Sequence, residues 1–300
     1  MAPNSGLRAC SGGLDEVAKS LITTQLGQLG NFARCWETNS PTRLSFPFPR
    51  AFPMAGFNSW KCVLSTFALV TSFAAPVAKA DSVLELFTSH GCYSCPPAEA
   101  LLTELLEKDD SIIALEFHVD YWNSLVYGSA GSWEDPFSKR AYTDRQRSYN
   151  GRNLEGRTGV YTPQAVINGQ YAAVGSNRSN VEAALKTSVG SDVSVNIEKV
   201  GNEWQVNVNN TSASSEAAEA AVWMVHFYKS KTTDITSGEN KGLVLENHNV
   251  VFSMDPIGSV PKSDSITLSA AFDDDPNVGC AVLVQDQFHS PILAAAKCPT

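Results

Sequence analysis

The sequence predicts an α/β domain over residues 81–190, followed by an all-β, antiparallel sandwich-like domain over residues 191–300. Two observations support this fold class. In the first part, strand-like and helical patterns alternate in the order β-α-β and then α-β-β-α. From Asp192 onward, apolar residues recur with a period of two, in short runs separated by Asn, Gly, Asp, Ser and Pro, which is typical of a β-sandwich.

The elements of the α/β domain follow from their apolar patterns. SVLELF (82–87) and SIIALEFHV (111–119) are apolar runs, and the second is nearly continuous, as expected for a central strand covered on both faces. Between them, AEALLTELLEK (98–108) carries apolar residues at helical spacing. The remaining elements are a polar helix over 137–150, a hairpin with an Asn-Gly turn over 162–175, and an amphipathic helix over 180–189.

The charge of the chain argues against some classes of partner. The net charge is −9, so we expect neither nucleic acid nor an anionic membrane as the main partner. Residues 1–80 carry a net charge of +4, whereas residues 81–300 carry −13. This division predicts a leader in front of an acidic mature protein. Since no apolar run reaches the length of a membrane span, we expect no transmembrane segment in the mature protein.

Residues 54–80 have the pattern of a signal peptide. A positive flank precedes an apolar stretch, and a small-x-small motif ends at Ala80. A short buried helix is the alternative. We therefore expect a periplasmic or secreted protein with cleavage near Ala80, and we interpret residues 1–53 as a disordered or non-native extension.

The cysteines of the mature chain divide into two pairs. Four of the seven cysteines lie after Ala80, an even number that suits disulfides in an oxidising compartment. Cys280 and Cys298 bracket two strand-like runs joined by a turn, so we expect them to form a structural disulfide. Cys92 and Cys95 form a C-x-x-C motif that follows a strand and opens a helix.

The Cys92–Cys95 motif predicts redox chemistry. Backbone N–H groups at a helix start stabilise a thiolate, and protonated His90 would add positive charge nearby. Pro96 and Pro97 fit only the first turn of a helix, so the helix should begin near Cys95 and leave Cys92 on a more exposed turn. We therefore expect Cys92 to attack a partner sulfur and Cys95 to resolve the mixed disulfide.

Pro163 is the second element of the predicted site. In a thioredoxin-like domain, the X-Pro bond at this point is cis and lies beside the C-x-x-C motif. We expect Thr162–Pro163 to be cis, although a trans proline at the start of an edge strand is the alternative. With the order of elements, this predicts that the α/β domain is thioredoxin-like.

Four segments carry a resemblance to a known family. LFTSHGCYSCPPAEALL, FHVDYWNSLVYGSAGSWEDPFSKRAYTDRQRSY, GVYTPQAVINGQ and GENKGLVLENHNVV resemble the bacterial secreted domain-of-unknown-function family numbered 1223. The resemblance covers most of residues 82–298. It implies membership of the thioredoxin-like superfamily, but it names no substrate, and it implies redox activity only by analogy.

His118 and Asp120 follow the second predicted strand and are auxiliary candidates. Strand ends are where ligands gather in α/β sheets, so either residue could transfer a proton to a leaving thiol. Either residue could instead be a hydrogen-bonded buried group. The arginines after residue 137 do not share one helix face, so we expect a solvated surface there; they are Arg140, Arg145, Arg147, Arg152 and Arg157.

The leading hypothesis is an exported thiol-disulfide oxidoreductase that acts on protein thiols or disulfides. Its catalytic residues are Cys92, Cys95 and Pro163, and it needs no metal or other cofactor. One alternative is a periplasmic module that binds Cu(I) or Zn through the same cysteines with His90 or His118. The other is a non-catalytic envelope adaptor in which the Cys92–Cys95 disulfide is structural.

Overall fold

A computed structural model describes most of the chain after residue 81. The described residues are 82–125, 134–152, 154–187, 192–211, 219–286 and 291–299. The expectations for the extension (1–53) and the signal peptide (54–80) lie outside them. The described residues belong to one compact unit, Val70–Thr300. Among the helices that they form, none is long and apolar enough to cross a membrane.

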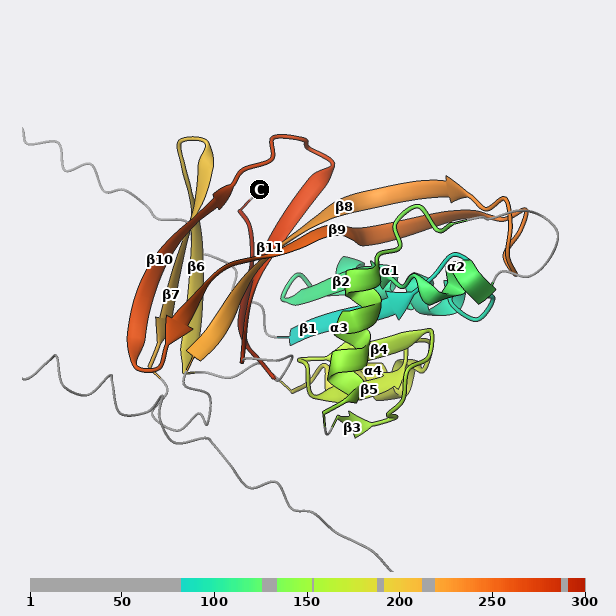
Figure 1. The fold of residues 1–300 in the computed structure, drawn as a ribbon, viewed down its shortest axis with the longest axis horizontal. Coiled ribbons are helices and arrows are strands. Elements are labelled where there is room, and N and C mark those ends of the chain that lie inside the picture. The colour runs from blue at the N-terminus through green and yellow to red at the C-terminus, as the bar shows by residue number, and fades with distance from the viewer. Residues whose placement is uncertain are drawn as a thin grey trace, which may run out of the picture. The chain divides into compact units, whose positions relative to one another are not determined.

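Strands predominate in the described residues (Figure 1). In chain order the elements are β1 (Ser82–Thr88), α1 (Pro96–Lys108), β2 (Ile112–His118), α2 (Tyr121–Leu125), α3 (Arg140–Asn150), β3 (Glu155–Gly156), β4 (Gln164–Ile167), β5 (Tyr171–Val174), α4 (Arg178–Ala184), β6 (Val193–Val200), β7 (Glu203–Asn210), β8 (Glu219–Asp234), β9 (Val244–Pro261), β10 (Asp264–Ala271), β11 (Val278–Asp286) and β12 (Ile292–Lys297).

The strands form two sheets. The large sheet has nine strands in the order β12-β11-β8-β9-β2-β1-β4-β5-β3, and the small sheet has the order β10-β7-β6. β1 and β2 are parallel, with Thr88 opposite His118. β9 joins β2 in parallel through Glu116 and Val250. The carboxyl ends of β1 and β2 therefore lie side by side next to the long β8–β9 hairpin.

The predicted α/β thioredoxin-like domain followed by an all-β domain is wrong. The described residues are mostly β, and the β2–β9 pairing joins strands from both halves of the chain into one mixed sheet, so no α/β thioredoxin-like domain stands apart. The physical reason is the length of β9, whose 18 residues extend far enough to pair with both β8 and β2. An apolar pattern reports the period of each strand but not a pairing between residues 116 and 250.

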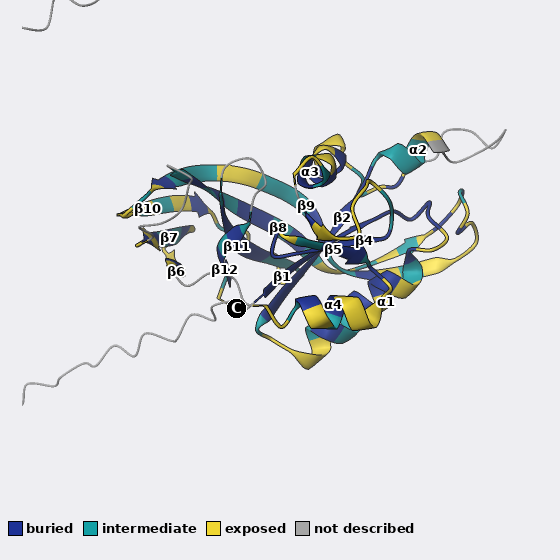
Figure 2. Cartoon of the chain, turned by 90° about the horizontal axis from the view of Figure 1, so that it is seen from below, coloured by how far each residue is buried: buried dark blue, intermediate teal, exposed yellow. Residues whose placement is uncertain are grey.

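Helices cover both faces of the sheet around β1 and β2 (Figure 2). Tyr142 and Tyr149 of α3 pack with Val83 and Phe87 on one face. Leu84, in the same strand, packs on the opposite face with apolar residues of α1 and α4. Successive side chains of a strand point to opposite faces, so a strand buried on both faces reads as a continuous apolar run.

The second core lies between the two sheets. Ile197 and Val206 of the small sheet pack with Val222 and Val282 of the large sheet. Cys280 and Cys298 form a disulfide at one end of the β11–β12 pair, where the Cys298 amide also donates to the Cys280 carbonyl at 2.9 Å. This disulfide fastens the carboxyl-terminal strand to its neighbour.

Some local elements differ from their predicted bounds. The stretch after β2 contains the short helix α2, and the polar helix begins at Arg140 rather than at residue 137. The last predicted helix, 180–189, spans Arg178–Ala184; it starts earlier than predicted because Asn177 caps it by accepting from the Asn180 amide at 3.2 Å. Asn168 and Gly169 both have positive φ, as a two-residue hairpin turn requires.

Candidate functional site

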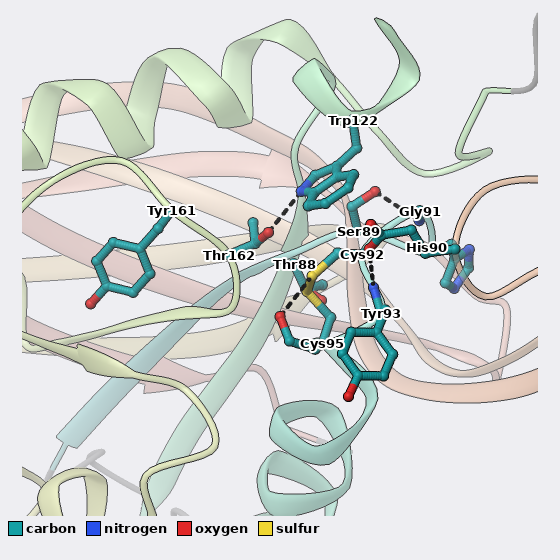
Figure 3. The surroundings of a disulfide bond; sticks show 12 residues. Thr88, Ser89, His90, Gly91, Cys92, Tyr93, Cys95, Trp122, Tyr161 and Thr162 are labelled. Carbon is teal, nitrogen blue, oxygen red and sulfur yellow. Dashed lines mark hydrogen bonds between the residues drawn. A yellow bond between two sulfur atoms is a disulfide. The ribbon is translucent and has the colours of Figure 1, made fainter. Parts of the chain in front are cut away.

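The C-x-x-C motif lies between β1 and α1. Cys92 and Cys95 form a disulfide, with their Cα atoms 5.5 Å apart (Figure 3). Cys95 is the N-cap of α1, and the prolines Pro96 and Pro97 occupy the first helical positions, as their chemistry predicts. Pro96 and Pro97 have no N–H, and the Ala98 and Glu99 amides donate to the Cys95 carbonyl at 2.8 and 3.2 Å. The motif therefore lies at the positive end of the helix dipole but not beside free helical N–H groups.

Both cysteines are buried. Cys92 is 1% exposed and Cys95 is 0% exposed, so the more exposed turn predicted for Cys92 is not found. Between them, Ser94 is exposed and Tyr93 is 73% exposed. The hydroxyl oxygen of Ser94 lies 3.4 Å from the Cys92 sulfur. The motif thus presents its two middle residues to solvent while its sulfur atoms are covered.

Part of the cover comes from the connection between β8 and β9. The side-chain amide of Asn240 donates to the carbonyl oxygens of His90, at 3.0 Å, and Cys92, at 2.9 Å. The Glu239 carboxylate accepts from the Tyr93 backbone N–H at 3.0 Å. Sequence reasoning missed both residues, although they lie in GENKGLVLENHNVV, one of the segments that carry the family resemblance.

The segment around Pro163, the second element of the predicted site, also lies near the disulfide. The Thr162–Pro163 bond is cis, as expected. Trp122 of α2 donates its indole N–H to the Thr162 hydroxyl at 2.7 Å, and Figure 3 shows both side chains next to the disulfide. The structure therefore brings Cys92, Cys95 and the residues around Pro163 together.

His90 and His118 meet at the ends of β1 and β2. Their rings are 4.8 Å apart between centroids, and both side chains are fully buried. Asp135 lies between them, with one carboxylate oxygen 2.8 Å from His118 Nδ1 and 2.7 Å from the His90 backbone N. Sequence analysis missed Asp135 because it lies in a segment that has no periodic pattern.

Two more polar side chains complete this group. Asn247 of β9 places its Oδ1 2.9 Å from His90 Nε2, and its amide nitrogen donates to the Glu116 carboxylate at 2.9 Å. We refer to His90, His118, Asp135, Glu116 and Asn247 as the histidine cluster. It joins the loop after β1, the end of β2, the segment before α3, and β9.

Burial and charge set the protonation of the cluster. Burial alone would lower the pKa of His118, but Asp135 and Glu116 outweigh it and raise this pKa to about 10. For Asp135, burial favours the neutral form, yet His118 and the His90 contacts hold its pKa well below the usual range. Burial and the nearby His118 lower the pKa of His90. The cluster thus contains a His118–Asp135 ion pair beside a neutral His90.

Glu99 of α1 is a further buried acid near this cluster. It accepts a hydrogen bond from the Thr88 hydroxyl at 2.5 Å. Burial, and then the charge of Glu116, raise the pKa of Glu99 to about 7, against the opposing effect of Thr88. This side chain therefore changes charge near neutral pH.

Asp120 and the five arginines are the remaining residues discussed from the sequence. Asp120 accepts from the Thr143 hydroxyl of α3 at 2.5 Å, so its hydrogen bond ties it to α3 rather than to the histidine cluster. The solvated surface predicted for the arginines is right for four of the five and wrong for Arg145, which is 4% exposed and binds Glu85 at 2.6 Å. The exposed four are Arg140, Arg147, Arg152 and Arg157.

One group in the described part of the chain could hold a metal ion. Ligand atoms of His90, His118 and Asp135 lie within 4.8 Å of one another. Cys92 and Cys95 are not members of this group, and their sulfur atoms are bonded to each other. The alternative in which these cysteines share a metal with a histidine has no support in this geometry.

Solved structures similar to this chain include a crystal structure of a protein from Agrobacterium tumefaciens, which is 26% identical. The similarity covers 75% of this chain and 96% of that protein, with a TM-score of 0.58. HBP35 of Porphyromonas gingivalis is 12% identical over 73% of this chain and 74% of its own, with a TM-score of 0.46. A DUF3823 family protein from Bacteroides ovatus is 14% identical over 36% and 51%, with a TM-score of 0.21.

The search of curated proteins gave no match. The family comparison gave a match over residues 83–285, which include the C-x-x-C motif, the histidine cluster and the β8–β9 connection that covers the disulfide. The chain therefore belongs to the family described as protein of unknown function (DUF1223).

Proposed function

We propose that this protein exchanges thiols and disulfides with protein partners through Cys92 and Cys95. The observation that carries the proposal is a C-x-x-C disulfide at the N-terminus of the 13-residue helix α1. Once the disulfide is reduced, the positive end of the helix dipole favours a thiolate at this position. A thiolate is the species that attacks a disulfide.

The exchange transfers two electrons. The Cys92 thiolate attacks one sulfur of a partner disulfide, forms a bond to it, and releases the other partner sulfur as a thiolate. The Cys95 thiolate then attacks Cys92 Sγ, re-forms the Cys92–Cys95 bond, and releases the second partner sulfur. The protein dithiol is oxidised and the partner disulfide is reduced, and the reverse sequence starts from the oxidised form.

Position favours Cys92 as the attacking sulfur. Cys92 lies in the loop before α1, next to exposed Tyr93 and Ser94, whereas Cys95 is held at the helix start. Since both sulfur atoms are covered, a partner has to displace part of the cover before exchange. Trp122 and Thr162 lie at the disulfide, and Pro163 would shape the chain there to receive a partner segment (Figure 3).

The predicted export of the chain supplies a suitable setting. A signal peptide over residues 54–80 would deliver the mature protein to an oxidising compartment, in which disulfides form and persist. Protein disulfides and thiols are the substrates expected there.

The reduction potential of Cys92–Cys95 tests the proposal. The full chain is equilibrated in glutathione buffers, its thiols are trapped by alkylation, and each pair is read by mass spectrometry. We expect a value between about −120 and −270 mV, the range of known exchange catalysts. A value below about −300 mV would identify a structural disulfide and favour the adaptor hypothesis. Cys280–Cys298 is an internal control that should stay oxidised.

Two substitutions separate the roles of the cysteines. Cys95→Ser should trap a partner as a mixed disulfide on Cys92, because the resolving thiol is missing. Cys92→Ser should abolish exchange and trap nothing. If neither variant differs from wild type in exchange with a model disulfide, the mechanism is wrong.

A further inference from the structure

The tautomer of His90 is fixed by its neighbours. The Asn247 amide nitrogen donates to Glu116 at 2.9 Å, so Asn247 Oδ1, which can only accept, faces His90 Nε2. His90 therefore carries a proton on Nε2. Its Nδ1 is buried without a hydrogen-bond partner, 3.7 Å from an oxygen of Asp135.

This arrangement is unfavourable unless a cation is added. In neutral His90 the lone pair of Nδ1 faces a carboxylate oxygen, so two electron-rich atoms oppose each other in a dry site. A proton on Nδ1 would not make a hydrogen bond, because 3.7 Å is too long for one. A metal ion bound to both atoms would convert this repulsion into attraction.

His118 presents a matching donor. Its Nδ1 lies 2.8 Å from the other oxygen of Asp135, and its Nε2, which has no hydrogen-bond partner, lies 3.7 Å from Glu116. When Nδ1 binds a metal, protonated His118 releases the Nδ1 proton to solvent and keeps the Nε2 proton, which faces that carboxylate. In each histidine, the Nε2–H then faces an acceptor while Nδ1 faces the metal, as is almost always the case for metal-binding histidines.

We propose that His90, His118 and Asp135 bind a divalent cation of the Zn²⁺ class without help from a cysteine. Imidazole nitrogen and carboxylate oxygen are normal zinc ligands. Asp135 is held ready by the backbone N–H groups of His90 and Phe137, at 2.7 and 3.0 Å. The Phe137 ring lies against both imidazoles, 5.7 and 5.4 Å from their centroids, and excludes water. The site goes beyond thiol exchange and uses neither sulfur.

Zinc binding by the full chain tests this site. Free thiols are first alkylated with iodoacetamide so that cysteines outside the disulfides cannot bind metal, and the protein is stripped with EDTA. Titration with Zn²⁺ is followed by calorimetry and elemental analysis. We expect about one zinc per chain. The His90→Gln variant should lose this zinc, and Asn247→Ala should bind it about 10- to 100-fold more weakly.

Two controls make the result specific. His248→Gln changes a histidine of β9 next to Asn247 in sequence but outside the cluster, and it should bind zinc like wild type. Cys92→Ser/Cys95→Ser should also keep its zinc, although it cannot exchange disulfides. Loss of zinc from this double variant would show cysteine ligation and overturn the proposal. Equal zinc content in wild type and His90→Gln would overturn it as well.

A second measurement needs no substitution. Stripped wild-type protein is loaded with Co²⁺ in place of Zn²⁺, and its visible and near-ultraviolet spectrum is recorded. We expect d–d absorption from bound cobalt without a thiolate-to-cobalt charge-transfer band. A charge-transfer band, or a spectrum equal to that of free Co²⁺, would overturn the proposal. Neither outcome bears on the reduction potential, so the two proposals can fail separately.

Discussion

Two buried polar groups border β1, and they differ in how completely they are paired. In the first group, Arg145 of α3 donates to Glu85 of β1 at 2.6 Å, to the Tyr149 hydroxyl at 2.8 Å and to Gln285 of β11 at 3.1 Å. Tyr149 in turn donates to Glu85. These four side chains leave no buried nitrogen or oxygen without a partner. We refer to them as the arginine network.

The histidine cluster is equally buried but is not completely paired. His90 Nδ1, His118 Nε2 and Glu116 Oε1 are buried atoms without hydrogen-bond partners. Two acidic side chains, Asp135 and Glu116, face His118.

The difference separates a structural role from a binding role. Buried polar atoms are nearly always paired in folded proteins, so a complete network such as the arginine network needs only a role in stability. It fastens α3 to strands from both halves of the chain. In the histidine cluster, by contrast, the unpaired Nδ1 of His90 faces Asp135, which also contacts His118 Nδ1, and this arrangement favours a binding role.

Breaking the arginine network should have the largest effect on stability. Arg145→Met removes the positive charge and leaves Glu85 buried without a counter-charge. We expect the free energy of unfolding to fall by about 3–5 kcal/mol, the usual result of breaking a buried ion pair. Urea denaturation followed by circular dichroism measures it.

Two variants show whether this loss comes from the unpaired charge. Arg178→Met removes an arginine whose ion pairs with Glu104 and Glu182 are exposed, and it should leave the urea midpoint near that of wild type. Glu85→Gln/Arg145→Met should recover part of the loss, because no unpaired charge remains. Equal loss in the double and single Arg145 variants would mean that the packing of Arg145, rather than its charge, stabilises the fold.

The burial of Glu99 near the histidine cluster, together with the charge of Glu116, predicts a pH dependence of stability. The pKa of Glu99 is about 7 in the folded protein and near 4.5 in the unfolded chain. The stability that this group contributes is therefore fully present below about pH 4.5 and is lost as the pH rises through about 7. Glu99→Gln cannot ionise, so from pH 5 to 8 it should gain roughly 3 kcal/mol of stability relative to wild type.

Denaturation at several pH values measures this difference. Glu107→Gln, at an exposed position on the same helix, is the matched control and should follow the wild-type profile. A Glu99→Gln profile parallel to that of wild type would show that the charge of Glu99 is compensated in the folded protein.

Local features of this molecule could be predicted from its sequence. The strands around residues 82–87 and 111–119 and the helix that starts after Cys95 follow from apolar spacing and proline chemistry. The cis bond before Pro163 followed from its place relative to the motif. For the strands and the helix the signal lies within a few residues of the feature, whereas the cis bond depended on the order of elements between the motif and Pro163.

Long-range features could not be predicted. The fold class failed because the pairing of β2 with β9 joins residues 116 and 250, and no local pattern encodes that contact. For the same reason sequence reasoning found His90 and His118 but not Asp135 or Asn247, which lie 45 and 157 residues from His90. Single polar residues in loops and in a long hairpin carry no periodic signal.

The smallest effect is expected for a substitution in the connection between β8 and β9, which borders the histidine cluster. Asn240→Ala removes two hydrogen bonds to the carbonyls of His90 and Cys92, each worth about 0.5–1.5 kcal/mol net. Because these bonds hold the C-x-x-C loop under its cover, the loop should open more often. Dithiothreitol should then reduce Cys92–Cys95 about tenfold faster, the ratio that about 1.4 kcal/mol gives.

The control for this variant is Asn196→Ala on β6, which removes an exposed side-chain contact with Glu198 and should not change the reduction rate. Cys280–Cys298 provides a second control in the same sample, since Asn240 makes no hydrogen bond to either of its cysteines in the described residues. If both disulfides are reduced faster in Asn240→Ala, the substitution has loosened the whole fold. If only Cys92–Cys95 responds, access to the motif is set by the connection between β8 and β9, and the two halves of the chain form one site.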